Sequence, residues 1–221
     1  MSIIRTTNRC FKKFERYSRS VYYSINANKK QTVKEMAENQ HRSRIVWIDM
    51  EMTGLDVETD RILEVACLIT DEHLNIVSDE FCKILYQPDS LLNNMDEWCT
   101  KTHRQTGLIE LSRKSKEDEK SVSDSLLHFM MKYIPKGKCP MAGNSVYMDR
   151  LFLRKYMSSA NDYMHYRIID VSSIKEVVRR WKPEIYNSAP SKDLCHRALD
   201  DIKESIQELD FYRKNVFNAN I

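Results

Sequence analysis

The stretch IVWIDMEM, residues 45–52, limits the possible folds of this chain more than any other feature. Four apolar residues open it as a buried strand, and two acids, Asp49 and Glu51, follow two positions apart. Because side chains alternate between the faces of a strand, both carboxylates should point the same way. Two neighbouring anions at the end of an apolar strand repel each other and lose hydration. The pattern therefore predicts a positively charged group that compensates them.

Turn residues and hydrophobic periodicity divide the rest of the chain into further elements. Predicted strands cover 45–52, 61–70, 75–86, 139–142 and 167–170. Predicted helices lie around 94–102, at 123–133, from 145, at 171–181 and from 196 to 217, with a solvated run at 113–120. A three-strand meander followed by alternating helices and strands is an α/β layered domain.

Charge is divided unevenly along the chain. Residues 1–42 hold ten Lys or Arg against three Glu, and the remainder holds 25 basic against 29 acidic residues. The main domain, predicted at 43–221, therefore lacks the basicity of proteins that bind long nucleic acids through many phosphates. No apolar run approaches the ~20 residues that a membrane-spanning helix needs, so we expect no membrane partner.

Residues 1–42 are predicted to be a basic N-terminal extension. Apolar residues recur there at helical spacing, Arg and Ser are frequent, and acids are scarce. This composition is typical of a mitochondrial transit peptide. A solvated basic arm that contacts RNA is the alternative. We favour the transit peptide and expect a mitochondrial location, with cytoplasmic or nuclear forms left open.

Partners for the two acids are expected at the ends of other elements. Asp149 follows the turn GNS early in a predicted helix, and the segment HRALDD supplies His196, Asp200 and Asp201. On the last predicted helix, Asp201 lies at the edge of the apolar stripe and Asp200 lies roughly opposite it. Asp201 can therefore border the core, whereas Asp200 should face water. His196 is expected in the preceding loop or the first turn.

These residues carry a family resemblance. Asp49-x-Glu51, Asp149 and His196-(x)4-Asp201 resemble the motif set of the DEDDh exonucleases, which have an RNase H-like fold with a mixed β-sheet flanked by α-helices. Within them, DMEMTGLD, GNSVYMDRLFL, YRIIDVSSIKE, RRWKPEI and HRALDDIKESI resemble the oligoribonucleases, in order along most of the chain. A lone DxE is common, but five ordered segments are specific. The resemblance implies 3′-to-5′ hydrolysis of short oligoribonucleotides, down to dinucleotides, to nucleoside 5′-monophosphates.

The resemblance also implies a role for each acid. Asp49 would bridge two divalent metal ions, Mg²⁺ or Mn²⁺, and Glu51, Asp149 and Asp201 would complete the ligand set. Hard ions favour carboxylate oxygens, and a pair of them stabilises the attacking and leaving oxygens of a phosphodiester. Such ions would also compensate the paired carboxylates. His196 would be the general base, and an ordinary histidine at a helix start is the alternative.

Further residues match the positions that hold substrate in this family. Leu55 would be an apolar wedge and Trp98 an aromatic platform for terminal bases, with His103 a weaker candidate. A buried core position is the alternative for Trp98.

A second group matches the cap on the 5′ phosphate. Ser145, Arg167 and Ser172 would form it, and Tyr166 would reach over from a second subunit of a homodimer. A helix N-terminus at Ser172 and a bidentate guanidinium at Arg167 suit an anion. A helix cap and a surface salt bridge are their alternatives. Tyr147 departs from the family pattern beside this pocket, where a small residue is usual.

Two other functions remain open. A broader DEDDh exonuclease would act on longer RNA or single-stranded DNA, which the weak basicity of the main domain disfavours. A non-catalytic RNA-binding protein on the same fold is the second, and all five catalytic positions being present disfavours it. The expected partner is short single-stranded RNA.

Overall fold

The computed structural model describes residues 41–191 and 196–217. The predicted basic extension falls almost wholly outside the described residues. Within the described part, no helix is both long and apolar enough to cross a membrane.

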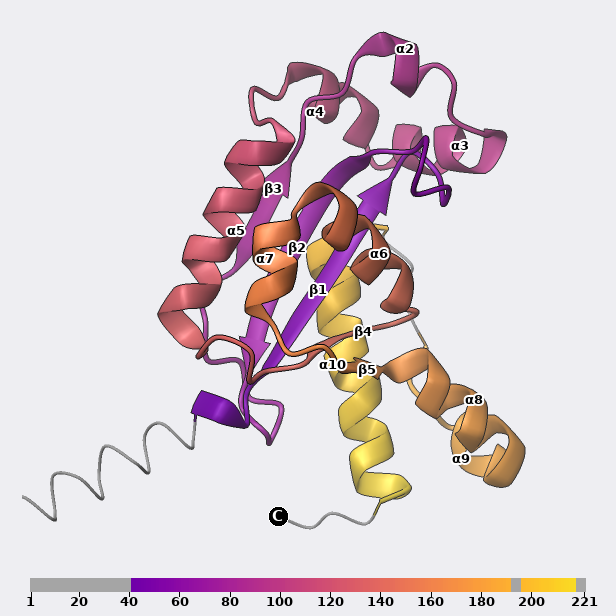
Figure 1. Cartoon of the computed structure of the whole chain (residues 1–221). Helices are drawn as coiled ribbons and strands as arrows, with labels where there is room; N and C mark the ends of the chain where they lie inside the picture. The colour runs from indigo at the N-terminus through magenta and orange to yellow at the C-terminus, as the bar shows by residue number, and fades with distance from the viewer. Residues whose placement is uncertain (1–40, 192–195, 218–221) are drawn as a thin grey trace, which may run out of the picture. The chain divides into compact units, whose positions relative to one another are not determined.

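A five-stranded mixed sheet forms the centre of the described domain (Figure 1). Its strands lie in the order β3-β2-β1-β4-β5. They are β1 (Ile45–Met52), β2 (Ile62–Thr70), β3 (Phe81–Ile84), β4 (Met141–Gly143) and β5 (Ile168–Asp170). The first three form an antiparallel meander, and β4 and β5 continue the sheet parallel to β1. This arrangement agrees with the predicted RNase H-like mixed sheet.

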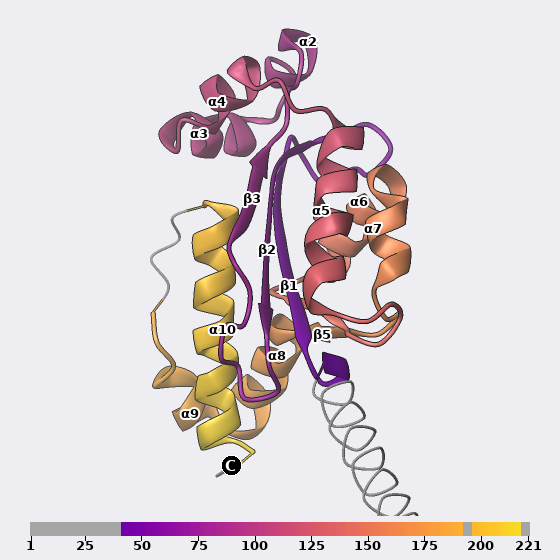
Figure 2. The same cartoon turned by 90° about the vertical axis from the view of Figure 1, so that its left-hand side faces the viewer.

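Helices cover both faces of the sheet (Figure 2). On one face lie α5 (Glu119–Tyr133), α6 (Tyr147–Tyr156) and α7 (Ser158–Tyr163), and on the other lie α8 (Val171–Trp181), α9 (Pro183–Asn187) and α10 (Ala198–Asn215). The alternation of β1 explains both cores. Val46 and Ile48 pack into the first, whereas Ile45 and Trp47 pack into the second, beneath α10.

Three short helices gather beyond the end of the sheet at which β1 ends (Figure 1). They are α2 (Asp89–Leu92), α3 (Glu97–Gln105) and α4 (Leu108–Lys114). A small apolar cluster that includes Leu63, Leu92 and Leu108 anchors them to β2. Asp96 caps α3 by accepting a 2.7 Å hydrogen bond from the backbone N–H of Cys99.

The short helices α2, α7 and α9 were not predicted, and the prediction differs from the structure in two further places. The strand predicted at 75–86 is only Phe81–Ile84, with one isolated bridge between Thr70 and Ile76, because polar residues interrupt the ladder. The polar stretch after 102 contains α4, which begins after Gly107 at φ 72°. Its apolar residues are too few for a strong periodic signal, and they are buried by tertiary packing.

Candidate active site

The two acids of β1 share one face of the sheet, as strand alternation predicts. Asp49 and Glu51 continue the row begun by Ile45 and Trp47, which α10 covers. Asp49 is partly buried, and the Glu51 side chain is only 12% exposed. Both carboxylates therefore stand where the apolar core gives way to the N-terminal end of α10.

Asp149 joins them from the first turn of α6. Its Oδ1 accepts a 2.9 Å hydrogen bond from the backbone N–H of Met50, between the two acids of β1, and its side chain is buried. The short strand β4 ends at Gly143, so a side chain occupies this part of the β1 edge. Gly143 permits the close approach, since a Cβ there would lie 2.9 Å from the carbonyl oxygen of Ile48.

The start of α10 brings in the remaining two predicted residues. Ligand atoms of Glu51, His196 and Asp201 all lie within 4.8 Å of one another. Asp200 is exposed, whereas Asp201 is partly buried, as the apolar stripe of the helix predicted. His196 has a left-handed backbone at φ 49°, which is costly for a non-glycine residue and which the surrounding contacts must hold. Together with Asp49 and Asp149, these three residues form what we call the acidic cluster.

An ion pair between residues that were not among the predicted site residues anchors this end of α10. Glu64 of β2 is fully buried and lies opposite Glu51 in the strand register. Its carboxylate accepts a 2.7 Å hydrogen bond from Nη2 of Arg197 and one of 3.1 Å from the backbone N–H of Ala198. Arg197 itself gives α10 no side-chain cap, so Glu64 fills that role from another strand. Only the pairing of Glu64 with Glu51 in the sheet could have indicated this role of Glu64.

The electrostatics of the acidic cluster favour neutral carboxyls. Burial, followed by the charges of Asp201, Glu64 and Asp149, raises the pKa of Glu51 from 4.5 to about 8, against an opposing effect of Arg197. Burial also raises the pKa of Asp149, with a contribution from Asp170. Several hard carboxylate oxygens crowded together in this way are a donor set that suits divalent cations, whose charge would restore the ionised forms.

The predicted wedge and platform flank the acidic cluster. Leu55 is 67% exposed on the turn that follows β1. Asp60 holds this turn by accepting hydrogen bonds from the Thr53 hydroxyl at 2.8 Å and the Asp56 backbone N–H at 2.9 Å. Trp98, on α3, is 60% exposed, and its ring centroid lies 5.7 Å from that of His196, edge to face. The exposed position that we favoured for Trp98 is therefore observed.

His103 differs from the expectation of a residue exposed to substrate. It is 1% exposed, and its Nε2 lies 2.9 Å from the Met52 carbonyl oxygen. Its Nδ1 lies 3.8 Å from Oε2 of Glu51, and burial lowers the pKa of the imidazole. The apolar side of α3 faces inward at this position, so His103 lies beneath Glu51 rather than at the surface.

Two of the predicted phosphate-binding residues line one hollow between α6 and α8. Ser145 and Ser172 meet there, with their hydroxyl oxygens 3.3 Å apart. We call this hollow the serine pocket; it is lined by Ser145, Tyr147, Asp170, Ser172, Ser173, Glu176, Val177 and Arg180. Ser145 has φ 51°, so the turn between β4 and α6 is strained where it enters the pocket.

Asp170 caps the N-terminus of α8, where the sequence prediction placed an anion. Its Oδ1 accepts hydrogen bonds from the backbone N–H groups of Ser172 at 2.9 Å, Ser173 at 3.4 Å and Ser145 at 3.1 Å. The expectation that these backbone groups face a ligand was wrong, because the preceding residue caps α8 first. The serine hydroxyls remain beside the pocket, with that of Ser145 donating to Ser172 and that of Ser172 donating to Asn144.

Arg167 and Tyr166 lie at the opposite end of β5 from Asp170. The guanidinium of Arg167 lies 5.5 Å from the centroid of the Tyr166 ring, and Tyr166 is 73% exposed. The described lining of the serine pocket includes Arg180 and not Arg167. Arg180 is paired with Glu176 one helical turn earlier. The sequence prediction missed it because a charge in the last turn of a helix is ordinary.

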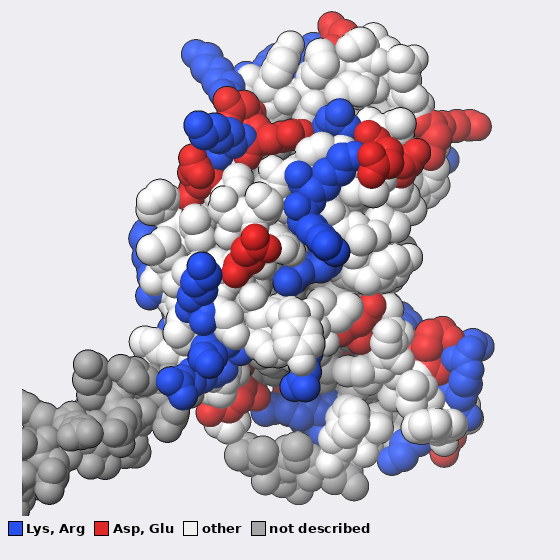
Figure 3. All heavy atoms as spheres, viewed as in Figure 1, with Lys and Arg blue, Asp and Glu red and all other residues white. Residues whose placement is uncertain are grey.

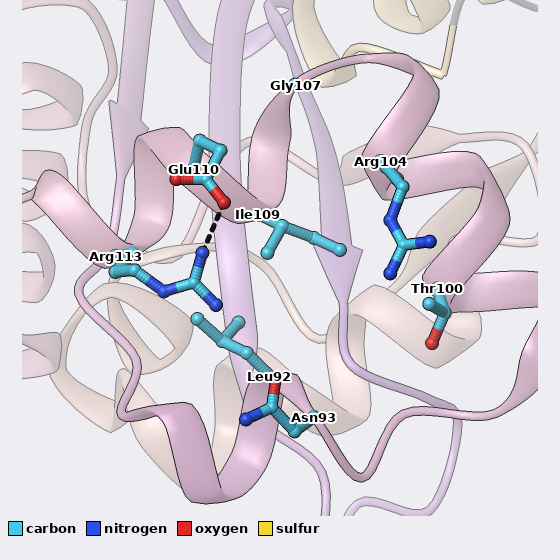
Figure 4. Close-up of a pocket in the computed structure, with 8 residues that line it drawn as sticks. All are labelled: Leu92, Asn93, Thr100, Arg104, Gly107, Ile109, Glu110 and Arg113. Carbon is cyan, nitrogen blue, oxygen red and sulfur yellow. Dashed lines mark hydrogen bonds and ion pairs between the residues drawn. The ribbon is translucent and has the colours of Figure 1, made fainter.

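A second hollow, of about 190 Å³, opens between α2, α3 and α4 (Figure 4). Among the described residues that line it, none is a predicted site residue. Its Arg113 is neutralised by ion pairs with Asp89 at 2.7 Å and with Glu110. Arg104 lines it as well, so this cavity differs from the acidic cluster in holding basic side chains rather than crowded carboxylates.

Comparison with solved structures identifies the fold. The structure of an exonuclease I superposes with a TM-score of 0.63 at 15% identity, covering 80% of this chain and 42% of that one. Exonuclease I of E. coli in complex with a 5cy-dT13 oligonucleotide gives 0.62 at 18% identity, with 80% and 42% covered. This chain thus spans about two fifths of the exonuclease I chains that it matches.

Sequence comparison identifies the family. Residues 46–209 match the RNase T exonuclease family. The probable oligoribonuclease of Drosophila melanogaster is 51% identical over 78% of this chain and 82% of that protein. The human mitochondrial oligoribonuclease is 51% identical over 80% and 75%, and that of Pseudoalteromonas atlantica 51% identical over 79% and 96%. The chain belongs to the exonuclease family and, within it, to the oligoribonucleases.

Proposed function

We propose that this protein removes nucleotides from the 3′ end of short single-stranded RNA, down to dinucleotides, and releases nucleoside 5′-monophosphates. The observation that carries the proposal is the convergence of Glu51, His196 and Asp201 within 4.8 Å beside the buried Asp149. Membership of the oligoribonucleases supports the substrate class.

Asp49, Glu51, Asp149 and Asp201 would hold two divalent ions, Mg²⁺ or Mn²⁺. The raised pKa of Glu51 supports this role, because it reflects burial and the neighbouring acids, which together outweigh the effect of Arg197. When bound, such ions supply charge stabilisation for the attacking and leaving oxygens and a more acidic water. The ligand set brings residues from β1, α6 and α10 to one point, so the ions would also tie these elements together.

His196 would take the proton from the attacking water at an imidazole nitrogen. A general base must lie within hydrogen-bond reach of the water, and its nitrogen stands among the same carboxylate oxygens that would hold the ions. The Glu64–Arg197 ion pair fixes the next residue in the chain. We therefore regard Glu64 as a positioning residue for this base.

Substrate would lie between the exposed Leu55 and Trp98 on one side and the serine pocket on the other. Stacking on Trp98 suits any base, which fits an enzyme without sequence preference. The hydroxyls of Ser145 and Ser172 would donate to the 5′ phosphate. His103, buried beneath Glu51, would act on substrate only through that carboxylate.

Arg167 and Tyr166 would complete the phosphate cap within a homodimer. Tyr166 is highly exposed just before the edge strand β5, where a second copy of the chain could be reached. Size-exclusion chromatography with light scattering tests the dimer. A monomer at micromolar concentration would contradict it.

The basic extension at 1–42 would direct the protein to mitochondria. Its composition and the mitochondrial oligoribonucleases among the relatives support this location, although bacterial relatives match equally well. Fusion of residues 1–42 to a fluorescent protein tests it. Import into mitochondria is expected, and a diffuse signal would favour the basic arm.

The rival enzyme is an exonuclease for longer RNA or single-stranded DNA. Long strands are bound through many phosphates, which requires a continuous basic surface. On the face shown in Figure 3, Lys and Arg are interspersed with Asp and Glu. The charge balance of the main domain, 25 basic against 29 acidic residues outside 1–42, likewise supports short substrates.

The test is hydrolysis of 5′-labelled RNA of two, three, five, ten and twenty nucleotides, with Mg²⁺, Mn²⁺ or EDTA. We expect cleavage that depends on the metal, proceeds from the 3′ end and is fastest on the dinucleotide. Equal or faster cleavage of the long strands would favour the broader exonuclease. Binding without cleavage at any length would favour the non-catalytic protein.

A further inference from the structure

A continuous chain of hydrogen bonds joins the serine pocket to the acidic cluster. The Ser172 hydroxyl donates to Oδ1 of Asn144 at 3.0 Å, and Nδ2 of Asn144 donates to the Ser205 hydroxyl oxygen at 2.6 Å. The Ser205 hydroxyl in turn donates to the backbone carbonyl of Asp201 at 2.7 Å. The chain crosses from α8 to α10 through the turn after β4, and it ends on a residue of the acidic cluster.

The surroundings hold this chain in one arrangement. Ser205 is 2% exposed, so its hydroxyl has no access to bulk water. Nδ2 of Asn144 also lies 3.5 Å from Oε2 of Glu208, which is 3% exposed. The Asn144 amide accepts a hydrogen bond on one side and donates one on the other. Loss of one of these hydrogen bonds therefore alters the geometry of the other.

Counting hydrogens shows what a ligand in the serine pocket must do. A serine hydroxyl carries one hydrogen, and that of Ser172 is directed at Asn144. The Ser172 oxygen already accepts from the Ser145 backbone N–H at 3.0 Å. The oxygens of a phosphate dianion only accept hydrogen bonds. For Ser172 to bind a phosphate, its hydrogen must turn away from Asn144.

We propose that Asn144 couples occupancy of the serine pocket to the position of Asp201, so that a 5′ phosphate raises the rate of the chemical step as well as the affinity. The proposal rests on the proposed function and assigns Asn144 and Ser205 as positioning residues. Filling the pocket releases Oδ1 of Asn144, and the change reaches Asp201 through Ser205. A long strand, whose 5′ end lies far from the scissile bond, cannot produce this effect, so the relay selects short substrates by rate.

The experiment measures single-turnover rates on a dinucleotide with and without a 5′ phosphate, at saturating enzyme and Mn²⁺. In the wild type, the 5′ phosphate should raise the saturated rate about tenfold, within the usual range of coupling between sites, and also lower the half-saturating enzyme concentration. In Ser205→Ala the effect on the saturated rate should fall to about twofold or less. The effect on half-saturation should persist, because Ser205 does not line the pocket.

Ser112→Ala is the matched control. Ser112 is also a fully buried helical serine, and it donates to the Leu85 carbonyl at 2.6 Å, in α4 rather than in the relay. Its loss should leave the wild-type dependence of the saturated rate on the 5′ phosphate, even if the protein is less stable. If Ser205→Ala does not fold, Asn144→Ala interrupts the same relay and should give the same change.

The outcomes separate the relay from the function. The coupling would be overturned if the 5′ phosphate still raised the saturated rate in the relay variants as it does in the wild type. It would also be overturned if the 5′ phosphate changed only the affinity of the wild type. Both results leave the proposed function standing. A wild type that does not cleave dinucleotides would overturn the proposed function itself, whereas one that cleaves them but ignores the 5′ phosphate would overturn the phosphate cap and the coupling with it. Adding Ser205→Ala to Ser172→Ala should cause no further loss in the rate effect.

Discussion

The acidic cluster and the serine pocket handle charge in opposite ways. In the acidic cluster, carboxylates crowd together in a partly buried place, and the pKa of Glu51 rises to about 8. In the serine pocket, the one carboxylate that faces the helix start, Asp170, accepts three backbone N–H groups. The first region is unbalanced until cations bind. In the serine pocket these polar groups already have hydrogen-bond partners, so a ligand must replace existing hydrogen bonds. Such an exchange contributes more to selectivity than to affinity.

The largest effect should follow from removing Asp201, a proposed metal ligand. Asp201→Ala should lower kcat/KM on a dinucleotide on the order of 10⁴-fold, because residues that act as one catalytic unit are lost together. Asp200→Ala is the matched control on the same helix turn, where the side chain faces solvent, and it should retain activity within about twofold. Similar losses in both variants would contradict the assignment of Asp201.

The unbalanced charge should also appear in the stability of the metal-free protein. Glu51 keeps its proton in the folded state between pH 4.5 and about 8, whereas the unfolded chain loses it. Stability should therefore fall as the pH rises through this window and level off above it. At ~1.4 kcal/mol per pKa unit, the upper limit is about 5 kcal/mol. Thermal unfolding in EDTA measures it.

Two additions sharpen this prediction. Glu51→Gln cannot ionise, so it should flatten the fall in stability and be more stable than the wild type in EDTA near pH 8. Mn²⁺ should stabilise the wild type more at the upper end of the window than at the lower end, since the ion binds ionised carboxylates. If the stability of the wild type in EDTA did not change with pH, the ionised form of Glu51 would not be disfavoured by its surroundings.

The Glu64–Arg197 ion pair, which anchors α10, should have a smaller effect than the acidic cluster. Its effect on the free energy of unfolding should exceed that of a surface ion pair. Glu64→Gln leaves Arg197 without its buried partner and should cost about 3 kcal/mol of unfolding free energy, the lower end for such pairs because Arg197 is partly exposed. It should also lower kcat, since His196 is the neighbouring residue. Urea unfolding and steady-state kinetics measure the two effects.

Glu58→Gln provides the comparison for this variant. Glu58 pairs with Lys155 at 2.7 Å, but its side chain is 77% exposed. Its loss should leave the free energy of unfolding and kcat close to the wild type. If the two substitutions had equal effects, Glu64 would be an ordinary ion pair and not a positioning residue.

The smallest effect is expected at the base platform. Trp98→Ala should cost ~2 kcal/mol of base stacking, or about 30-fold in kcat/KM on a dinucleotide. Trp98→Phe keeps an aromatic face and should recover most of it. Because stacking is lost rather than chemistry, fluorescence binding titrations in Ca²⁺ should show the same loss in affinity. Unchanged affinity would remove Trp98 from the substrate path.

The elements that carry the acidic cluster could be predicted because each has a strong local signal. β1 opens with four consecutive apolar residues, and the edge of the apolar stripe on α10 separates Asp201 from Asp200. The convergence of Glu51, His196 and Asp201 required the sheet order, which no local pattern contains. The family resemblance supplied it.

Residues that act through other residues escaped prediction. Asn144, Ser205 and Glu64 are common residue types whose importance lies in partners about 60 to 130 positions away in the sequence. Asp170 was not among the predicted site residues, and it caps the helix that was expected to bind an anion. His103 was predicted as a weaker substrate-binding candidate from the segment of Trp98, but it lies on the buried face of α3.

The most direct test of the two-region account is kcat/KM on a dinucleotide and on a twenty-nucleotide strand for Asp201→Ala and Ser172→Ala. The account predicts that Asp201→Ala loses activity on both lengths alike, since every substrate passes through the acidic cluster. Ser172→Ala should lose much more on the dinucleotide, whose 5′ phosphate reaches the serine pocket, than on the long strand. Equal losses on both lengths for Ser172→Ala would contradict the division between a chemical region and a length-sensing region.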